Sequence, residues 1–350
     1  MKISAILNNQ EKRVAITPET TKKYVDLGLK VILPHNIGVG AGFGDEEYSA
    51  AGAVIEKELP EADLYVCVKP SFEVKLKSGS YLIAMLSPFK NQKILEKMAA
   101  EGINLCVLEK IPRITRAQSM DVLSSQANIA GYRAVLEGFY EYRRVVPLMM
   151  TAAGTVRPAR VLILGAGVAG LQAIATAKRL GAMVSAFDVR AAAKEQVESL
   201  GAAFIEVENS VDGETAGGYA KEMDADYQKR QSEKLAQIIS KVDVAITTAQ
   251  IPGKAAPKLI TGEMVKSMPN GSVIVDMSME TGGNCEMSKE NEVVRVGGVS
   301  IIGYTDFAAR AAYDSSQLFA RNVYNFVSLM IKDGKIDPSD EIIQATLFGA

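Results

Sequence analysis

The chain has 350 residues, of which 48% are hydrophobic and 23% are charged, a composition typical of globular proteins. At roughly 100 to 200 residues per domain, this length predicts two domains. A formal net charge of -2, with no Lys/Arg cluster on a predicted helix face, argues against a nucleic-acid partner. No apolar stretch approaches the roughly 18 residues of a membrane-spanning helix, and the charged start does not resemble a signal peptide. We therefore expect a cytoplasmic protein without direct membrane insertion.

The thiols and imidazoles are too few and too scattered for a metal site. Cys67, Cys106 and Cys285 are far apart in the sequence, each among apolar or small residues, and His35 is the only histidine. No CxxC pair occurs. This usage predicts reduced thiols and no bound metal.

Short apolar segments alternate with helix-like segments in the first third of the chain. In order, these segments are KISAIL at 2–7, PETTKKYVDLG at 18–28, KVILPH at 30–35, LYVCV at 64–68, YLIAML at 81–86 and LCVLE at 105–109. Such alternation predicts parallel strands joined by crossover helices.

A long segment with helical spacing, residues 125–150, is interrupted by Pro147 and is interpreted as a helix between two domains. A second series of strands begins at Val161–Leu164. The later strand-like segments are AMVSAFD at 182–188, AAFIEV at 202–207, VDVAITTA at 242–249, GSVIVDMS at 271–278 and VSIIGYT at 299–305. The helical segment 315–331 is expected to return to the first domain.

The expected fold class is α/β, with two Rossmann-like doubly wound parallel-sheet domains joined by long helices. The first domain is predicted to comprise residues 1–125 together with about 310–350. The second is predicted to comprise residues 126–309, including the linking helix.

The second domain opens with a glycine-rich turn. The strand VLIL runs directly into Gly165-Ala-Gly167-Val-Ala-Gly170, and a helix-like segment follows. In a dinucleotide-binding turn the first glycine permits the tight bend, the second admits the pyrophosphate and the third allows close packing of helix and strand. The helix N-terminus then faces the phosphates. A purely structural turn is the alternative.

The next predicted strand ends in Asp188, where a carboxylate would accept hydrogen bonds from the adenosine ribose and repel a 2′-phosphate. Arg190 complicates this interpretation, because an arginine in this place sometimes accommodates a 2′-phosphate. We favour the carboxylate, and therefore predict NAD(H) as the cofactor.

Four segments together resemble the NAD(H)-binding component of proton-translocating transhydrogenase, a relative of alanine dehydrogenase. They are RITRAQSMDVLSSQANIAGYRAV at 113–135, residues 149–182 around the glycine turn, ETAGGYAKEM at 214–223 and AITTAQIPGKAAPKLIT at 245–261. The opening RVAITPE at 13–19 also matches, so the resemblance covers nearly the whole chain. Its most specific segment is RAQSMD followed by SSQ, which no generic dinucleotide-binding domain requires.

The resemblance implies that the loop from Arg113 to Ser124 lies over the nicotinamide. Gln118 can hydrogen-bond a carboxamide and a ribose hydroxyl, Arg113 can stabilise charge, and Asp121 can hold Arg113 in place. The resemblance also implies cofactor contacts at Ile114, Thr115 and Arg116. A polar helix start with capping side chains is the alternative interpretation of this segment.

The ETAGGYAKEM segment resembles a mobile loop that closes over the nucleotide and presents Tyr219, with Gly218 supplying backbone freedom. By this resemblance the catalytic residues are Arg113, Gln118, Asp121, Ser124 and Tyr219. Further cofactor contacts are implied at Val168, Val189, Arg190, Gly218, Gln231 and Gln250. Gln250 departs from the family pattern, in which an apolar residue commonly precedes IPG.

An alternative is an alanine dehydrogenase, which uses an arginine, a lysine and a histidine in its first domain. Arg13 and Lys69 match the first two, but Met85 stands where the histidine belongs. Methionine cannot move a proton, so amino-acid chemistry is disfavoured. Arg13 and Lys69 are then either structural ion-pairing groups or inherited pocket residues. A non-catalytic nucleotide-binding module is the third hypothesis.

The implied reaction is reversible hydride transfer between NADH on this chain and NADP⁺ on a separate NADP(H)-binding subunit. A membrane-spanning subunit would couple the transfer to proton translocation. The chain would then lie peripherally on the cytoplasmic face of the inner membrane. The resemblance also implies a homodimer.

Overall fold

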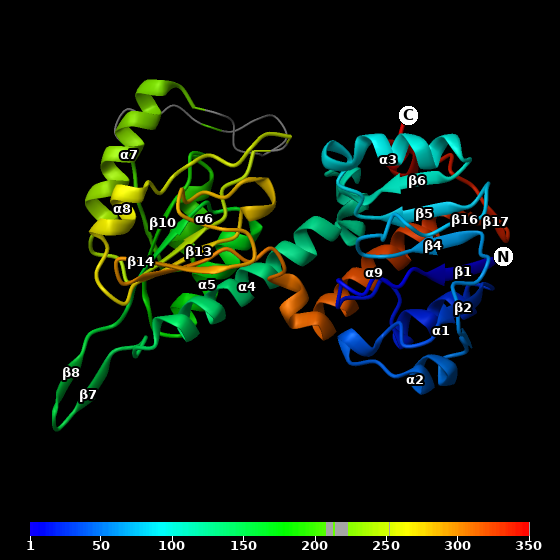
Figure 1. Ribbon diagram of the computed structural model, residues 1–350, viewed down its shortest axis with the longest axis horizontal. Helices are drawn as coiled ribbons and strands as arrows, with labels where there is room; N and C mark the ends of the chain where they lie inside the picture. The colour runs from blue at the N-terminus through cyan, green and yellow to red at the C-terminus, as the bar shows by residue number, and fades with distance from the viewer. Residues whose placement is uncertain (208–212, 214–222, 252, 350) are drawn as a thin grey trace. The chain divides into compact units, whose positions relative to one another are not determined.

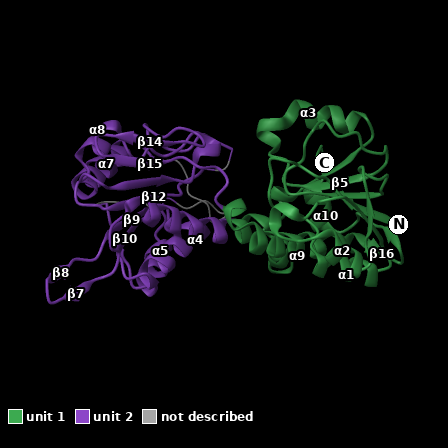
Figure 2. Cartoon of the chain, turned by 60° about the horizontal axis from the view of Figure 1, so that its bottom comes forward, with its two compact units in different colours: residues 1–126, 308–350 green, residues 127–307 purple. Residues whose placement is uncertain are grey.

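The computed structural model describes residues 1–207, 213, 223–251 and 253–349 (Figure 1). These form two compact units (Figure 2): unit 1 comprises residues 1–126 and 308–350, and unit 2 comprises residues 127–307. The chain passes from unit 1 to unit 2 inside one long helix, α4 (Val122–Tyr142). It returns just before a second long helix, α9 (Ala312–Met330).

Unit 1 is built on a six-stranded sheet in the order β3-β2-β1-β4-β5-β6. All neighbouring strands are parallel. The strands are β1 (Lys2–Ala5), β2 (Lys30–Pro34), β3 (Val54–Glu56), β4 (Leu64–Val66), β5 (Tyr81–Ala84) and β6 (Asn104–Val107). The order runs outward from β1 in both directions, as in a doubly wound sheet.

Helices cover both faces of this sheet. Tyr24 and Phe319 pack on one face beside Ile3, whereas Leu95 packs on the other beside Leu82. The helices of unit 1 are α1 (Pro18–Asp26), α2 (Asp45–Ala50), α3 (Pro88–Ala100), α9 and α10 (Glu341–Thr346), with 3₁₀ turns η1 (Val39–Ala41), η2 (Leu108–Lys110), η3 (Thr115–Met120) and η5 (Ala308–Ala311). A small antiparallel pair, β16 (Ile331–Lys332) and β17 (Lys335–Ile336), follows α9.

Unit 2 is built on a seven-stranded sheet in the order β11-β10-β9-β12-β13-β15-β14. Its strands are β9 (Arg160–Leu164), β10 (Met183–Phe187), β11 (Ala203–Phe204), β12 (Val244–Thr247), β13 (Val273–Asp276), β14 (Val293–Val296) and β15 (Val299–Ile302). The pairs are parallel except that β14 lies antiparallel at the edge. Edge strands of this kind are common on otherwise parallel sheets.

The central strands of unit 2 are buried on both sides, which explains their continuous apolar sequences. Besides α4, the helices of this unit are α5 (Val168–Arg179), α6 (Ala193–Ser199), α7 (Ala225–Ile239), α8 (Gly262–Ser267) and the 3₁₀ turn η4 (Met279–Thr281). In β9, Val161 and Ile163 face one core while Leu162 and Leu164 face the other, because successive side chains point to opposite faces. The first core is closed by α4 and α5 and the second by α7 and α8.

The predicted helix over residues 125–150 is wrong in its second half. The helix ends at Tyr142, where Arg143 adopts a left-handed φ of 53° and Pro147 cannot continue helical hydrogen bonding. Met149–Thr151 instead forms β7, which pairs antiparallel with β8 (Gly154–Val156) in a separate hairpin. The sequence analysis also did not predict β3 or β14.

All three cysteines are free and buried. Burial raises the pKa of the Cys106 thiol to about 12 and also raises that of Cys67 and Cys285. The single histidine, His35, pairs with Asp45. Within the described ranges, no cluster of three or more His, Cys, Asp and Glu residues could hold a metal ion, and no helix combines the length and apolarity needed to cross a membrane.

The close approach of α4 to α5 in unit 2 depends on Gly131. A Cβ at this position would collide with the carbonyl oxygen of Ala169, a backbone atom that cannot turn aside. We expect Gly131→Ala to lower the free energy of unfolding by about 1–3 kcal/mol despite the better helix propensity of alanine. Gly138→Ala in the same helix is the matched control, since its Cβ would meet only valine methyl groups, the nearest at 3.0 Å. Thermal unfolding followed by circular dichroism should rank Gly131→Ala clearly below Gly138→Ala, and the reverse order would contradict this packing account.

Candidate nucleotide-binding site

The glycine turn predicted from the sequence joins β9 to α5. Gly165 has a φ of 100°, a left-handed conformation that favours glycine. A Cβ on Gly170 would collide with the carbonyl oxygen of Gly165. Both glycines are therefore required by the fold of the turn itself.

Gly167 is different, because nothing lies within 4 Å of a Cβ built on it. It is the N-cap of α5, with an extended backbone (φ -74°, ψ -168°) that any residue can adopt. The protein does not need glycine at this position. The open space lies at a helix N-terminus, where free N–H groups and the helix dipole favour an anionic group.

Asp188 lies directly beside this turn, although it comes from the next strand. Its Oδ2 accepts a hydrogen bond of 2.7 Å from the backbone N–H of Ala166, and its Oδ1 accepts one of 2.9 Å from that of Arg190. The Arg190 guanidinium also pairs with the carboxylate, with Nη2 2.9 Å from Oδ2. Ribose hydroxyl groups at Asp188 would therefore share the carboxylate with Arg190.

The turn lies at the topological switch point of the sheet, where β10 flanks β9 on one side and β12 flanks it on the other. Ligands of doubly wound sheets bind at this place. Thr248, which follows β12, donates from Oγ1 to the carbonyl oxygen of Gly165 at 2.9 Å. The sequence analysis missed Thr248, although it stands in the quoted segment AITTAQIPG at the carboxyl end of a predicted strand.

The other predicted contacts of unit 2 are distributed around this edge. Val168 is the first residue of α5, Val189 accepts a hydrogen bond from Gly213 through its carbonyl oxygen, and Gln231 is buried on α7. Gln250 is exposed after β12. Gly218 and Tyr219 lie outside the described residues.

The loop predicted to contact the nicotinamide belongs to unit 1. The side chains of Arg113, Ile114, Thr115 and Gln118 are exposed along it. Asp121 immediately precedes α4 and accepts hydrogen bonds from Ser124, at 2.9 Å from its backbone N–H and at 2.6 Å from its hydroxyl. Asp121 and Ser124 thus form a helix cap, the alternative considered for this segment.

Contacts to the C-terminal region of unit 1 hold this loop. Both Asn322 and Asn325 donate to the carbonyl oxygen of Ser119, at 2.7 and 3.0 Å. Arg116 makes a two-pronged pair with Asp340, at 2.7 and 3.0 Å, and also contacts Glu341. The guanidinium of Arg116 is therefore directed at the start of α10. These partners lie more than 200 positions apart in the chain, so no local sequence pattern could have revealed them.

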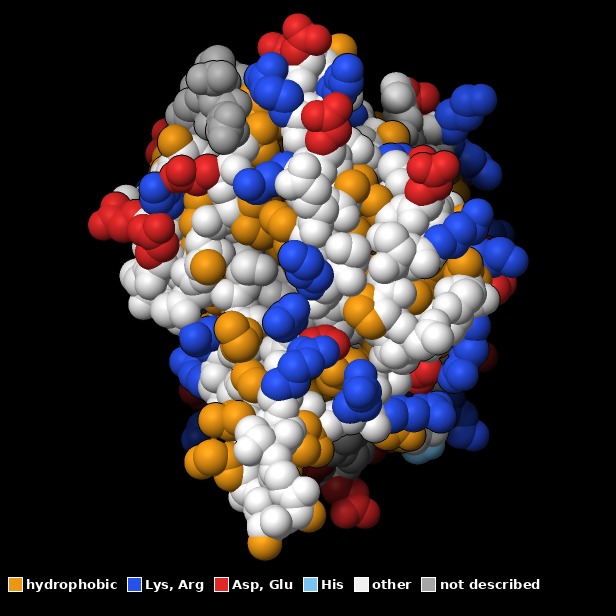
Figure 3. Space-filling view, turned by 90° about the vertical axis from the view of Figure 1, so that its left-hand side faces the viewer, with side chains coloured by type: hydrophobic (Ala, Val, Ile, Leu, Met, Phe, Trp, Pro, Cys, Tyr) orange, Lys and Arg blue, Asp and Glu red, His pale blue; other side chains and the backbone are white. Residues whose placement is uncertain are grey.

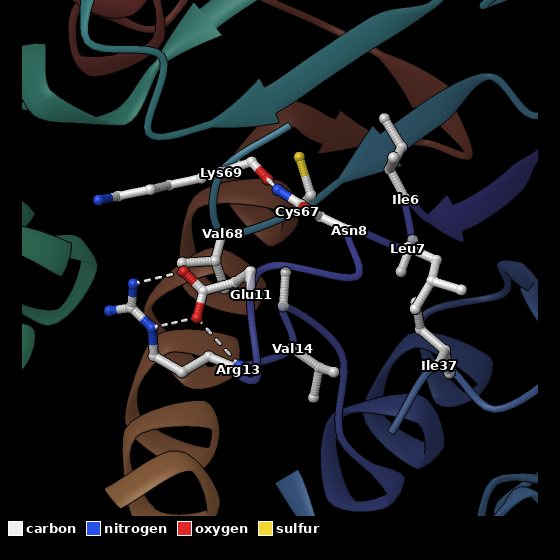
Figure 4. Close-up of a pocket in the computed structure, with 12 residues that line it drawn as sticks. Ile6, Leu7, Asn8, Glu11, Arg13, Val14, Ile37, Cys67, Val68 and Lys69 are labelled. Carbon is white, nitrogen blue, oxygen red and sulfur yellow. Dashed lines mark hydrogen bonds and ion pairs between the residues drawn. The ribbon is translucent and has the colours of Figure 1, made fainter. Parts of the chain in front are cut away.

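A small pocket in unit 1 contains Arg13 and Lys69 (Figure 4). Arg13 is almost fully buried and pairs with Glu11 through Nε and Nη2, at 2.8 and 2.7 Å. Its Nη1 donates to Gln126 at 2.7 Å. Burial acts to raise the pKa of Glu11, but the hydrogen bonds and charge of Arg13, aided by Lys69, outweigh burial and hold that pKa below its usual value. Of the two interpretations of Arg13, the geometry supports the structural ion pair.

Met85, at the position predicted to carry a histidine in an alanine dehydrogenase, follows β5 and is buried in the core of unit 1. Its thioether supplies no group that could transfer a proton.

Known proteins resemble this chain over nearly its full length. Residues 5–130 match the family model described as "Alanine dehydrogenase/PNT, N-terminal domain", and residues 134–349 match its C-terminal counterpart. The first of the separate polypeptides named as "NAD(P) transhydrogenase subunit alpha" in Rhodospirillum rubrum is 49% identical, over 96% of this chain and 92% of the relative. A solved transhydrogenase structure from Sinorhizobium meliloti superimposes with a TM-score of 0.91 at 45% identity, covering 99% of this chain and 98% of that one. The "Alanine dehydrogenase 1" of Staphylococcus aureus is more distant, at 32% identity over 80% of this chain and 72% of the relative. The chain belongs to the alanine dehydrogenase/PNT family.

Proposed function

We propose that this chain is the NAD(H)-binding component of a proton-translocating NAD(P) transhydrogenase. The observation that carries the proposal is the β9–α5 turn, in which Gly167 leaves open space that the fold itself does not require. The likeness to the relative named as a transhydrogenase alpha subunit supports the same activity.

The residues of the turn would bind the pyrophosphate through backbone N–H groups at the start of α5. Asp188 would accept hydrogen bonds from the adenosine ribose, which favours NAD(H) over NADP(H) because a carboxylate repels a 2′-phosphate. On unit 1, Gln118 and Arg113 would orient the nicotinamide. Arg116 is better suited to holding the loop, because Asp340 and Glu341 engage its guanidinium.

Bound NADH supplies the hydride, which passes reversibly to NADP⁺ held on a partner subunit. Direct hydride transfer requires close, aligned approach of the two nicotinamide rings and no acid or base. The exposed Arg113–Gln118 segment fits this requirement, because it offers orienting groups and no buried proton relay. Asp121 and Ser124 would act by fixing the end of this segment on α4. Tyr219 and Gly218 are proposed to cover the bound nucleotide.

The proposed enzyme needs two further components on separate chains, an NADP(H)-binding subunit and a membrane-spanning subunit. The name of the Rhodospirillum rubrum relative, which describes an alpha subunit divided into numbered pieces, supports an enzyme assembled from several chains. This chain would then lie on the cytoplasmic face of the inner membrane through its partners.

We also propose that the chain forms a homodimer through the β7–β8 hairpin. All strand residues of this hairpin are exposed, and hydrophobic side chains appear at the lower end of the view in Figure 3, where the hairpin lies. Leu148, Met149, Met150 and Val156 are between 43% and 77% exposed. An isolated hairpin is marginally stable in water, and exposed apolar surface of this kind is typical of an interface. A second copy is the occupant that the proposed assembly supplies.

The nucleotide site is tested by Gly167→Ala, which places a methyl group in the open space without straining the backbone. We expect the dissociation constant for NADH to rise roughly tenfold to hundredfold, because the pyrophosphate can no longer approach the turn closely. The free energy of unfolding should change by less than about 0.5 kcal/mol. Isothermal titration calorimetry measures the first quantity and chemical denaturation the second.

Gly44→Ala is the matched control for this substitution. Gly44 is also an N-cap glycine with an extended backbone, and a Cβ there meets only Glu47 Oε2 at 3.7 Å. This variant should bind NADH as the wild type does. Wild-type protein should bind NADH more tightly than NADPH. Unchanged NADH binding by Gly167→Ala would remove the main support for the site.

The homodimer is tested by Met150→Asp, which places a charge on the most exposed apolar residue of the hairpin. Sedimentation equilibrium should show a dimer for the wild type and a shift to monomer for the variant, since an unpaired charge is costly to bury in an interface. Phe89→Asp is the control, because Phe89 is 85% exposed but lies on α3 of unit 1. A monomeric wild type, or a Met150→Asp variant that dimerises normally, would refute the proposed interface.

A further inference from the structure

A fully buried carboxylate, Asp276, lies at the carboxyl end of β13 in unit 2. Only neutral donors make its hydrogen bonds: Thr247 Oγ1 at 3.1 Å, Ser278 N at 3.1 Å and Asn284 N at 3.0 Å to Oδ1, and Cys285 N at 2.9 Å and Ser288 Oγ at 2.8 Å to Oδ2. A buried charge persists when donors satisfy its lone pairs in this way. The carboxylate thereby fixes the loop that follows β13, residues 277–288.

Asn284 is the member of this loop that reaches outward to a neighbouring segment. Its side chain is completely buried. Its Oδ1 accepts from Ala249 N at 3.1 Å, while its Nδ2 donates to Ala249 O at 2.9 Å and to Pro257 O at 2.8 Å. Ser278 Oγ donates to the same Ala249 carbonyl at 3.1 Å. Both backbone polar groups of Ala249 are therefore held by the loop after β13.

Ala249 directly follows Thr248, the residue that contacts the glycine turn. Thr248 donates from its backbone N–H to Leu164 O at 2.8 Å and from its hydroxyl to Gly165 O at 2.9 Å. The Ala249 nitrogen itself lies 3.1 Å from a Cβ built on Gly165. Hydrogen bonds thus run without interruption from Asp276, through Asn284, to the segment that faces the turn.

We propose that Asn284, oriented by Asp276, is a positioning residue for the nucleotide site. It holds residues 248–250 at a set distance from the glycine turn, so that this wall of the site is formed before ligand arrives. Preorganisation of this kind increases affinity because the cost of ordering the wall is not charged to binding. The inference rests on the NAD(H) site proposed above and adds the residue that sets its second wall.

A merely structural role would stabilise the unit without affecting the ligand, and the other end of the same strand provides that comparison. Ser272 precedes β13, is buried, and donates from Oγ to Val242 O at 3.1 Å. This bond also joins the neighbourhoods of β13 and β12, but at the amino ends of the strands, away from the glycine turn. Ser272→Ala therefore removes a buried hydrogen bond between the same elements without disturbing residues 248–250.

The test is titration of the full chain with NADH, well below the unfolding temperature, for Asn284→Ala, Ser278→Ala and Ser272→Ala. We expect the dissociation constant to rise about tenfold for Asn284→Ala, about threefold for Ser278→Ala and less than about twofold for Ser272→Ala. Melting temperatures should fall in all three. Ser278→Ala removes only one side-chain hydrogen bond to Ala249, so it decides the question if Asn284→Ala does not fold.

Wild-type affinity in both Asn284→Ala and Ser278→Ala would overturn the inference, as would an equal loss of affinity in Ser272→Ala. A wild-type chain that fails to bind NADH would instead overturn the proposed function itself. The two failures are therefore distinguishable in one experiment.

Discussion

The architecture of unit 2 depends on the contact between α5 and the turn that precedes it. Gly170 lies so close to the Gly165 carbonyl that no side chain fits between them, and this proximity brings the N-terminus of α5 onto the edge of the sheet. Thr248 seals the same turn from the neighbouring strand, and Asp188 hydrogen-bonds to it from the other side. With the turn held from three directions, Gly167 is left as the position whose lack of a side chain serves something outside the protein.

Unit 1 has the same doubly wound topology, yet its switch point, between β1 and β4, is occupied differently. No glycine-rich turn follows β1. The pocket there contains an arginine already paired with Glu11 and Gln126, and Met85 nearby in the sequence supplies no proton. Unit 1 instead contributes the exposed Arg113–Gln118 loop, held by Asn322 and Asn325 from α9. One topology thus supports a nucleotide turn in one unit and a presented loop in the other.

The sequence predicted those features that local chemistry determines. The strand Val161–Leu164, the glycine turn and the fold class could be read because short apolar runs and glycine spacing carry their own physical meaning. The helix over 125–150 was predicted too long, because apolar residues such as Met149 and Met150 continue its spacing while actually forming an exposed hairpin. Arg116 and Asn284 could not be interpreted from sequence, since their roles depend on partners brought close only by the complete fold. The roles of Arg113, Gln118 and Tyr219 in hydride transfer stay predictions.

The central claim is that this chain holds one half of a hydride-transfer reaction. The most direct measurement is the reduction of an NAD⁺ analogue by NADPH, followed spectrophotometrically with the purified chain alone, with an NADP(H)-binding transhydrogenase subunit added, and with alanine in place of NADPH. The account predicts reduction only when the NADP(H)-binding subunit is present, and none driven by alanine. Alanine-dependent reduction by the isolated chain, or no hydride transfer with the partner subunit present, would contradict it.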